Sequence, residues 1–160
     1  MALCLTFWST LLSYAPLTTP ATPNNDFASA PLIWVVEDSA EDFAVLARAM
    51  RGAGPATLVQ WPRAEEAVER LDATPEVPAL LLVDLNLPGM DGAAFIERVR
   101  ASGDQRWSEV PICVLSSSTR TTDIERTKAA GANAYRVKPR RAAELRELAQ
   151  YARSLAARLD

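Results

Sequence analysis

The sequence predicts an α/β protein in which a parallel sheet is covered by helices on both faces. Short apolar runs alternate with amphipathic segments of helical spacing along residues 32–160. The central run, 79–83, is continuously apolar, as expected of a strand that is buried on both faces. Polar residues stand directly after several of these runs. Strand and helix alternation of this kind favours parallel strands joined by right-handed crossovers.

Breakers and caps delimit each predicted element. The predicted strands are 32–36, 56–61, 79–83, 112–115 and 134–137. The predicted helices are 40–51, 64–72, 93–102, 123–130 and about 141–159. Ser39 is expected to cap the first helix, and Gly131 to close the fourth. Residues 103–109 are predicted as a polar connection without regular structure.

Length and composition exclude several classes of protein. A chain of 160 residues forms about one domain, and its net charge of -3 argues against nucleic acid as the main partner. The chain has no histidine, which excludes histidine metal sites, a Ser-His-Asp triad and a histidine phosphodonor. Cys4 lies near the N-terminus and Cys113 in an apolar run, so a reducing compartment is expected rather than a disulfide framework.

Residues 1–31 differ from the rest of the chain. Residues 2–15 are largely apolar, and 16–25 are rich in Pro and Thr. A secretory signal peptide is one interpretation, but the segment lacks a leading Lys or Arg and is too short to span a bilayer. We expect a flexible tail, arising from an upstream start site, followed by a folded domain over 32–160.

Reactive side chains follow the predicted strands at the edge where open α/β sheets bind ligands. They are Glu37, Asp38, Asp84, Ser116 and Lys138. Carboxylates gathered this closely repel one another unless a cation neutralises them, and their oxygens suit Mg²⁺. With a lysine and a hydroxyl beside them, they could hold a phosphoryl group on the central aspartate.

Each of these residues also has an ordinary structural explanation. An aspartate or serine after a strand is more often a turn or cap residue, and a lone lysine usually lies on the surface. One such residue at nearly every strand end, in the right chain order, is improbable by chance. We therefore treat the set as one predicted site.

Four segments resemble the receiver domains of bacterial two-component response regulators. They are 35–38, 83–92, 111–116 and 130–139, and the likeness extends over about 32–160. The resemblance implies a flavodoxin-like (βα)5 doubly wound fold with strand order 2-1-3-4-5. It also implies phosphorylation by a partner sensor histidine kinase with Mg²⁺ as cofactor.

The resemblance also implies a role for each matching residue. Asp84 resembles the phosphoacceptor, and Glu37 and Asp38 the acidic pair that binds the metal together with the backbone carbonyl of Asn86. Ser116 resembles the switch hydroxyl and Lys138 the ion-pairing lysine. The remaining two assignments are Tyr135, similar to the aromatic whose rotamer reports activation, and Pro139, whose bond to Lys138 is expected to be cis.

The same resemblance leads to expectations about the cellular role. The acidic start of the first helix, with a further Asp42, is similar to the small receivers that partner bacterial phytochromes. We expect a cytoplasmic, stand-alone response regulator that signals through protein contacts and is no enzyme beyond its own phosphorylation and dephosphorylation. No nucleic-acid or membrane partner is expected.

Three other functions remain open at this stage. They are a protein-binding module independent of phosphorylation, a phosphorelay shuttle or phosphate sink, and a hydrolase of small phosphoesters, for which no substrate cap is evident. The last helix carries apolar residues at heptad-like spacing, namely Leu145, Leu148, Ala152, Leu155 and Leu159. These residues either pack on the sheet or also form a homodimer, for which we expect the face between the fourth strand and the last helix.

Overall fold

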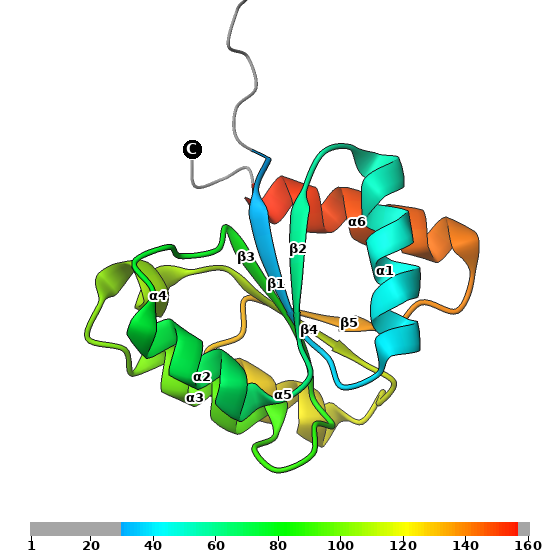
Figure 1. Cartoon of the computed structure of the whole chain (residues 1–160). Coiled ribbons are helices and arrows are strands. Elements are labelled where there is room, and N and C mark those ends of the chain that lie inside the picture. Colours follow the sequence, from blue (N-terminus) through cyan, green and yellow to red (C-terminus); the bar gives the residue numbers. More distant parts are fainter. Residues whose placement is uncertain (1–29, 157–160) are drawn as a thin grey trace, which may run out of the picture.

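A computed structural model describes residues 30–156 and confirms the predicted fold (Figure 1). Five parallel strands form one sheet in the order β2-β1-β3-β4-β5. The strands are β1 (Leu32–Val36), β2 (Thr57–Trp61), β3 (Leu80–Asp84), β4 (Ile112–Ser116) and β5 (Ala134–Val137). The predicted tail lies almost wholly outside these residues, as does Leu159 of the last predicted helix.

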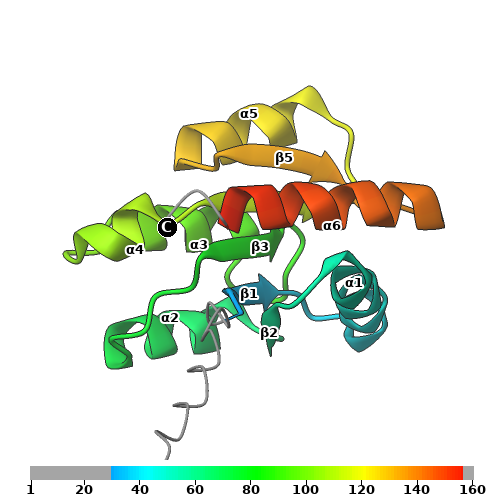
Figure 2. The same ribbon diagram turned by 90° about the horizontal axis from the view of Figure 1, so that it is seen from above.

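Helices cover both faces of the sheet. They are α1 (Ala40–Ala53), α2 (Ala64–Ala73), α3 (Gly92–Arg100), α4 (Gln105–Glu109), α5 (Thr121–Ala130) and α6 (Ala142–Ala156). Figures 1 and 2 show α1 and α6 on one face, and α2, α3 and α5 on the other. Within residues 30–156, no helix is long and apolar enough to cross a membrane.

The alternation of side chains along the strands divides the core into two layers. In β3, Leu81 and Val83 pack under α2 and α3, whereas Leu80 and Leu82 pack under α1 and α6. All residues of β3 are buried, which explains why its sequence is continuously apolar until the final aspartate. Because β3 is buried throughout, it holds Asp84 rigidly at the carboxyl end of the central strand.

The prediction that residues 103–109 lack regular structure was wrong, because α4 occupies most of this segment. Asp104 caps this helix by accepting a hydrogen bond from the backbone N–H of Arg106. Trp107 is buried against Trp34, with 5.1 Å between their ring centroids. One apolar residue in so short a helix produces no periodicity, so the sequence pattern could not show it.

The apolar residues of α6 pack chiefly on the sheet. Leu148 and Ala152 belong to the core beneath α1 and α6, and Leu155 lies partly buried against it. Leu145 is half-buried. This arrangement accounts for the heptad-like spacing without a partner. It also corrects the surface expected for a dimer, because β4 is buried inside the sheet and cannot contribute to one.

Candidate functional site

Three carboxylates meet at the carboxyl edge of the sheet. Glu37 and Asp38 follow β1, and Asp84 is the last residue of β3. One carboxylate oxygen from each lies within 4.8 Å of the others. Glu37 and Asp84 are only 5% and 7% exposed, whereas Asp38 faces solvent. The three carboxylates predicted to cluster therefore lie together, and two of them, Glu37 and Asp84, are shielded from water.

Lys138 places its ammonium group inside this cluster. Its Nζ lies 2.7 Å from Glu37 Oε2, 2.9 Å from Asp84 Oδ2 and 2.8 Å from Asp42 Oδ2. Burial alone would lower the pKa of Lys138, but the hydrogen bonds to these three carboxylates outweigh it and raise that pKa. The side chain is thus held as a cation at the centre of the site.

Glu37 is the most deeply placed member of the acidic pair. Burial raises the pKa of its carboxyl group, and the neighbouring Lys138 opposes that rise. Its Oε1 accepts a hydrogen bond from the backbone N–H of Ser39 at 3.1 Å. Its backbone carbonyl accepts another from Gln60 Nε2 at 2.9 Å. These contacts hold the β1–α1 connection against the end of β2.

A tight loop follows Asp84 and shapes the other side of the site. The backbone N–H of Asn86 lies 3.3 Å from Asp84 Oδ1, and Gly89 turns the chain with a φ of 77°. Asp91 then caps α3 by accepting a hydrogen bond from the backbone N–H of Ala94. Gly92 folds back so that its N–H donates to the carbonyl of Leu85 at 3.0 Å.

Replacing Gly92 by alanine is expected to disturb this loop. A Cβ at this position would collide with the backbone carbonyl oxygen of Asp84, which cannot move without shifting β3. We expect a loss of about 2–3 kcal/mol in the free energy of unfolding, measured by urea denaturation. Gly103→Ala is the matched control, because nothing lies within 4 Å of its added methyl group. Equal stability of the two variants would contradict the prediction.

The side chains of Ser116 and Tyr135 are linked because both form hydrogen bonds with the backbone of Ser118. The fully buried Ser116 accepts a hydrogen bond at Oγ from the backbone N–H of Ser118 at 3.1 Å. The hydroxyl of Tyr135 donates to the backbone carbonyl of Ser118 at 2.9 Å. Both side chains are therefore anchored to the β4–α5 loop, a link that no sequence pattern indicated.

The prediction of a cis peptide bond between Lys138 and Pro139 was wrong. All peptide bonds among residues 30–156 are trans. The trans form of an X–Pro bond is favoured by about 0.5–1 kcal/mol unless its surroundings select the other isomer. Lys138 reaches all three carboxylates from the trans arrangement, so the ion-pair geometry does not require a cis bond.

The β4–α5 loop and α5 carry a second group of charges that the sequence analysis did not single out. Arg126 of α5 pairs with Asp91 at 2.6 Å, and Arg120 pairs with Asp123 at 3.0 Å. Together with Asp38 and the loop after β3 they line a polar cavity of about 500 Å³. The pair of Arg126 with Asp91 joins elements 35 residues apart in the sequence, so no local pattern indicated it.

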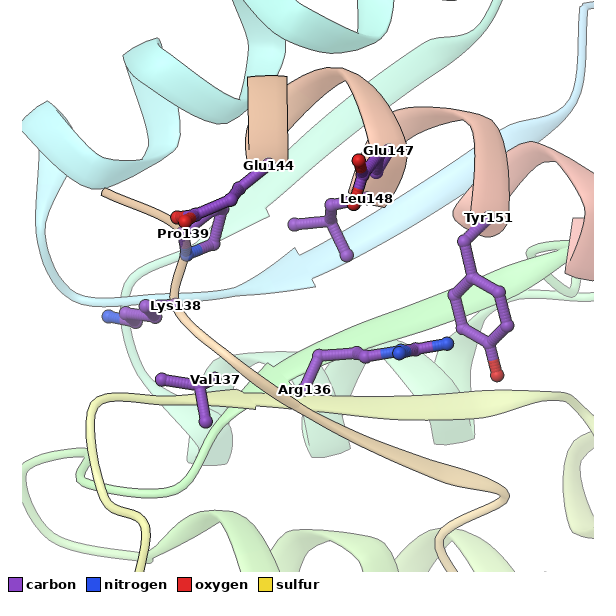
Figure 3. A pocket seen from close by; sticks show the side chains of 8 residues that line it. All are labelled: Arg136, Val137, Lys138, Pro139, Glu144, Glu147, Leu148 and Tyr151. Atoms are coloured by element: carbon purple, nitrogen blue, oxygen red, sulfur yellow. The ribbon is translucent and has the colours of Figure 1, made fainter. Parts of the chain in front are cut away.

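A groove of about 420 Å³ lies between β5 and α6 (Figure 3). Arg136 lies over the ring of Tyr151, 4.3 Å from its centroid. In Figure 3 the side chain of Arg136 extends toward Tyr151, whereas that of Lys138 points the opposite way. Lys138 is also among the residues that line this groove, so the groove adjoins the acidic cluster at the end of β5.

The donor set of the acidic cluster fits a hard divalent cation. Three carboxylates supply oxygen ligands, and one of them, Asp38, is open to solvent. Mg²⁺ favours such sites because it retains several of its waters. Glu37, Asp38 and Asp84 are the residues that would hold it.

Fold and site together define a class of protein, the flavodoxin-like α/β domains with a lysine-neutralised acidic site at the carboxyl edge of the sheet. Comparison with known proteins identifies the family: residues 33–150 match the response regulator receiver domain. The chain belongs to this family. It is a receiver domain of the two-component signalling type.

Known relatives and solved structures agree with this assignment. The chain is 34% identical to the transcriptional regulatory protein PrrA of Mycobacterium leprae, over 73% of this chain and 47% of that protein. It is 30% identical to the chemotaxis protein CheY1 of Helicobacter pylori, over 66% and 82% of the two chains. The chain thus spans about half the length of PrrA, but most of CheY1.

Among solved structures, the phosphorylated cyanobacterial phytochrome response regulator RcpA is similar with a TM-score of 0.71. The two are 25% identical, and the match covers 82% of this chain and 97% of RcpA. The Mn²⁺-bound form of the response regulator Rcp1 is similar with a TM-score of 0.68 and 25% identity, over 78% and 92% of the two chains.

Proposed function

We propose that Asp84 accepts a phosphoryl group from a histidine of a sensor kinase, with Mg²⁺ as cofactor. The observation that carries this proposal is the position of Asp84. Its carboxylate ends a buried strand, lies within reach of two further carboxylates and contacts a lysine ammonium. The family membership of the chain supports the same chemistry.

The reaction requires little of the protein beyond positioning and charge neutralisation. An oxygen of Asp84 attacks phosphorus, a P–O bond forms, and the P–N bond to the donor imidazole breaks with its electron pair leaving on nitrogen. Lys138 is placed to neutralise charge on the phosphoryl oxygens, since its Nζ already contacts Asp84 Oδ2. Bound Mg²⁺ would supply further neutralisation of the transferred group.

We propose that Ser116 and Tyr135 transmit the change. Both contact Ser118 of the β4–α5 loop, so a movement of the Ser116 hydroxyl toward a phosphoryl group would release the N–H of Ser118. The Tyr135 hydroxyl, bonded to the carbonyl of the same residue, would sense that movement. Phosphorylation would thereby alter the surface formed by this loop and β5.

The physiological donor is proposed to be a cytoplasmic sensor kinase of the bacteriophytochrome type, and the chain to act as a stand-alone regulator. The likeness to RcpA and Rcp1 supports this choice. Faster phosphotransfer from a purified phytochrome kinase than from a chemotaxis kinase is the expected result. Equal rates from both would contradict the choice of kinase without affecting the role of Asp84.

Incubation with acetyl phosphate tests the central proposal. With Mg²⁺ present, the protein should gain one phosphoryl group that is stable to acid and labile to base. Chelation of the metal with EDTA should abolish the gain. Intact-protein mass spectrometry measures both. Failure of the Mg²⁺-containing sample to be labelled by acetyl phosphate or any tested kinase would contradict the proposal.

The homodimer remains a prediction, now placed on the exposed side of β5 and α6. Val137 is 50% exposed there, beside the exposed Arg136. We propose that phosphorylation favours association through this surface. Sedimentation at tens of micromolar should show a dimer in the phosphorylated sample. A monomer in both states would contradict the prediction.

A further inference from the structure

Asp42 contacts the site from outside the acidic cluster. It lies in the first turn of α1, and its Oδ2 accepts a hydrogen bond from Lys138 Nζ at 2.8 Å. Its side chain is 52% exposed. It is not among the three carboxylates that are close enough to share a metal ion. Asp42 therefore contacts the site only through Lys138 among the residues that the structure describes.

Carboxylate oxygens already surround the ammonium group of Lys138. An ammonium carries three N–H groups, and three carboxylate oxygens lie within 2.9 Å of Nζ. A phosphoryl group on Asp84 would add further acceptor oxygens beside it. To bind one of them, Lys138 must give up an existing partner.

Asp42 is the partner most easily given up. Glu37 is buried, so leaving its carboxylate unpaired would be costly. Asp84 carries the phosphoryl group itself. Asp42 is more than half exposed, and water can solvate its carboxylate once the lysine leaves.

We propose that Asp42 is a positioning residue that competes with the phosphoryl group for Lys138. In the unphosphorylated protein it draws the ammonium toward α1. On phosphorylation the ammonium leaves Asp42 and binds a phosphoryl oxygen. Asp42 thereby sets how strongly the site retains its phosphoryl group. This inference rests on the proposed role of Asp84.

The test measures equilibrium binding of beryllofluoride, a tetrahedral anion that mimics a phosphoryl group, by calorimetry in Mg²⁺. Asp42→Asn should tighten binding about twofold to fivefold, the range for a half-exposed ion pair. Glu41→Gln is the matched control, because it removes an equal charge from the neighbouring exposed residue of α1. Unchanged or weaker binding by Asp42→Asn, or equal tightening by Glu41→Gln, would overturn the proposal.

A double-mutant cycle separates competition for the lysine from simple repulsion of the anion. In a Lys138→Met background, Asp42→Asn should have no effect on beryllofluoride affinity. Equal tightening in both backgrounds would overturn the role of Lys138 as intermediary. If wild type neither binds beryllofluoride nor accepts a phosphoryl group, the proposed function itself fails, which is a separate result.

Lysine resonances provide a readout that does not depend on variant affinity. Lys128 and Lys138 are the only lysines in the sequence, so ¹³Cε labelling of lysine yields two signals. In the free protein, Asp42→Asn should shift the Lys138 signal and leave that of Lys128 unchanged. A Lys138 signal at its wild-type position would show that the contact is absent in solution, and would overturn the inference.

Discussion

An Asp84→Asn variant is expected to lose labelling by acetyl phosphate, to at least about a hundredfold below wild type. The amide that replaces the carboxylate has no anionic oxygen to attack phosphorus. The substitution also removes the negative charge of one of the three carboxylates that could hold a metal. Intact-protein mass spectrometry at several times of incubation measures the effect.

Folding of the Asp84→Asn variant must be shown in the same experiment. The substitution preserves side-chain volume and removes one charge from a crowded acidic cluster, so we expect urea denaturation to show no large loss of stability. Asp91→Asn serves as the matched control, because asparagine retains the capping role at α3. That variant should be labelled like wild type. Equal labelling of Asp84→Asn and Asp91→Asn would remove Asp84 from its proposed role.

Replacing Lys138 by methionine is expected to destabilise the fold by about 3 kcal/mol at neutral pH. The ammonium neutralises Glu37 and Asp84, both of which are buried. Without it, two carboxylates face each other in a partly dry site. Removal of the exposed pair with Asp42 adds little, because water replaces the lysine there. Urea denaturation measures the loss.

The loss should depend on pH in a defined direction. Burial raises the pKa of Glu37 above its ordinary value of 4.5, and removing Lys138 raises it further. A carboxyl group with a raised pKa stabilises the fold below its ordinary pKa, and this contribution is lost as the pH rises through the folded-state pKa. The Lys138→Met deficit should therefore be small near pH 4 and grow toward neutrality.

Lys128→Met is the control for this prediction, since Lys128 is an exposed lysine on α5. It should change stability by less than about 0.5 kcal/mol at any of these pH values. Added Mg²⁺ should restore part of the stability of Lys138→Met by taking over charge neutralisation. A deficit that is the same at pH 4 and at neutral pH would contradict the electrostatic explanation.

Among residues 30–156, the sequence alone indicated the five strands, five of the six helices and most of the site. Apolar runs such as 79–83 mark strands buried on both faces, because their composition reflects the environment of each residue directly. In a parallel sheet every strand ends at the same edge. Residues as distant as Glu37 and Lys138 were therefore predictable neighbours, and their Nζ to Oε2 distance is 2.7 Å.

Only the tertiary structure decided the contacts that depend on side-chain direction and on packing between distant elements. Trp107 is buried because it packs against Trp34. Its own helix is too short to show a periodic pattern of apolar residues. The bond before Pro139 is trans, although the resemblance led us to expect cis; the two isomers of an X–Pro bond differ so little in free energy that the local sequence does not decide between them. In the sequence, Asp42 only contributed to the likeness to receivers that partner phytochromes; its contact with Lys138 depends on how α1 lies beside the end of β5. Sequence patterns indicate the strands and helices, and the resemblance to receiver domains implied their order, but the partners of a long flexible side chain depend on where its neighbours lie in space.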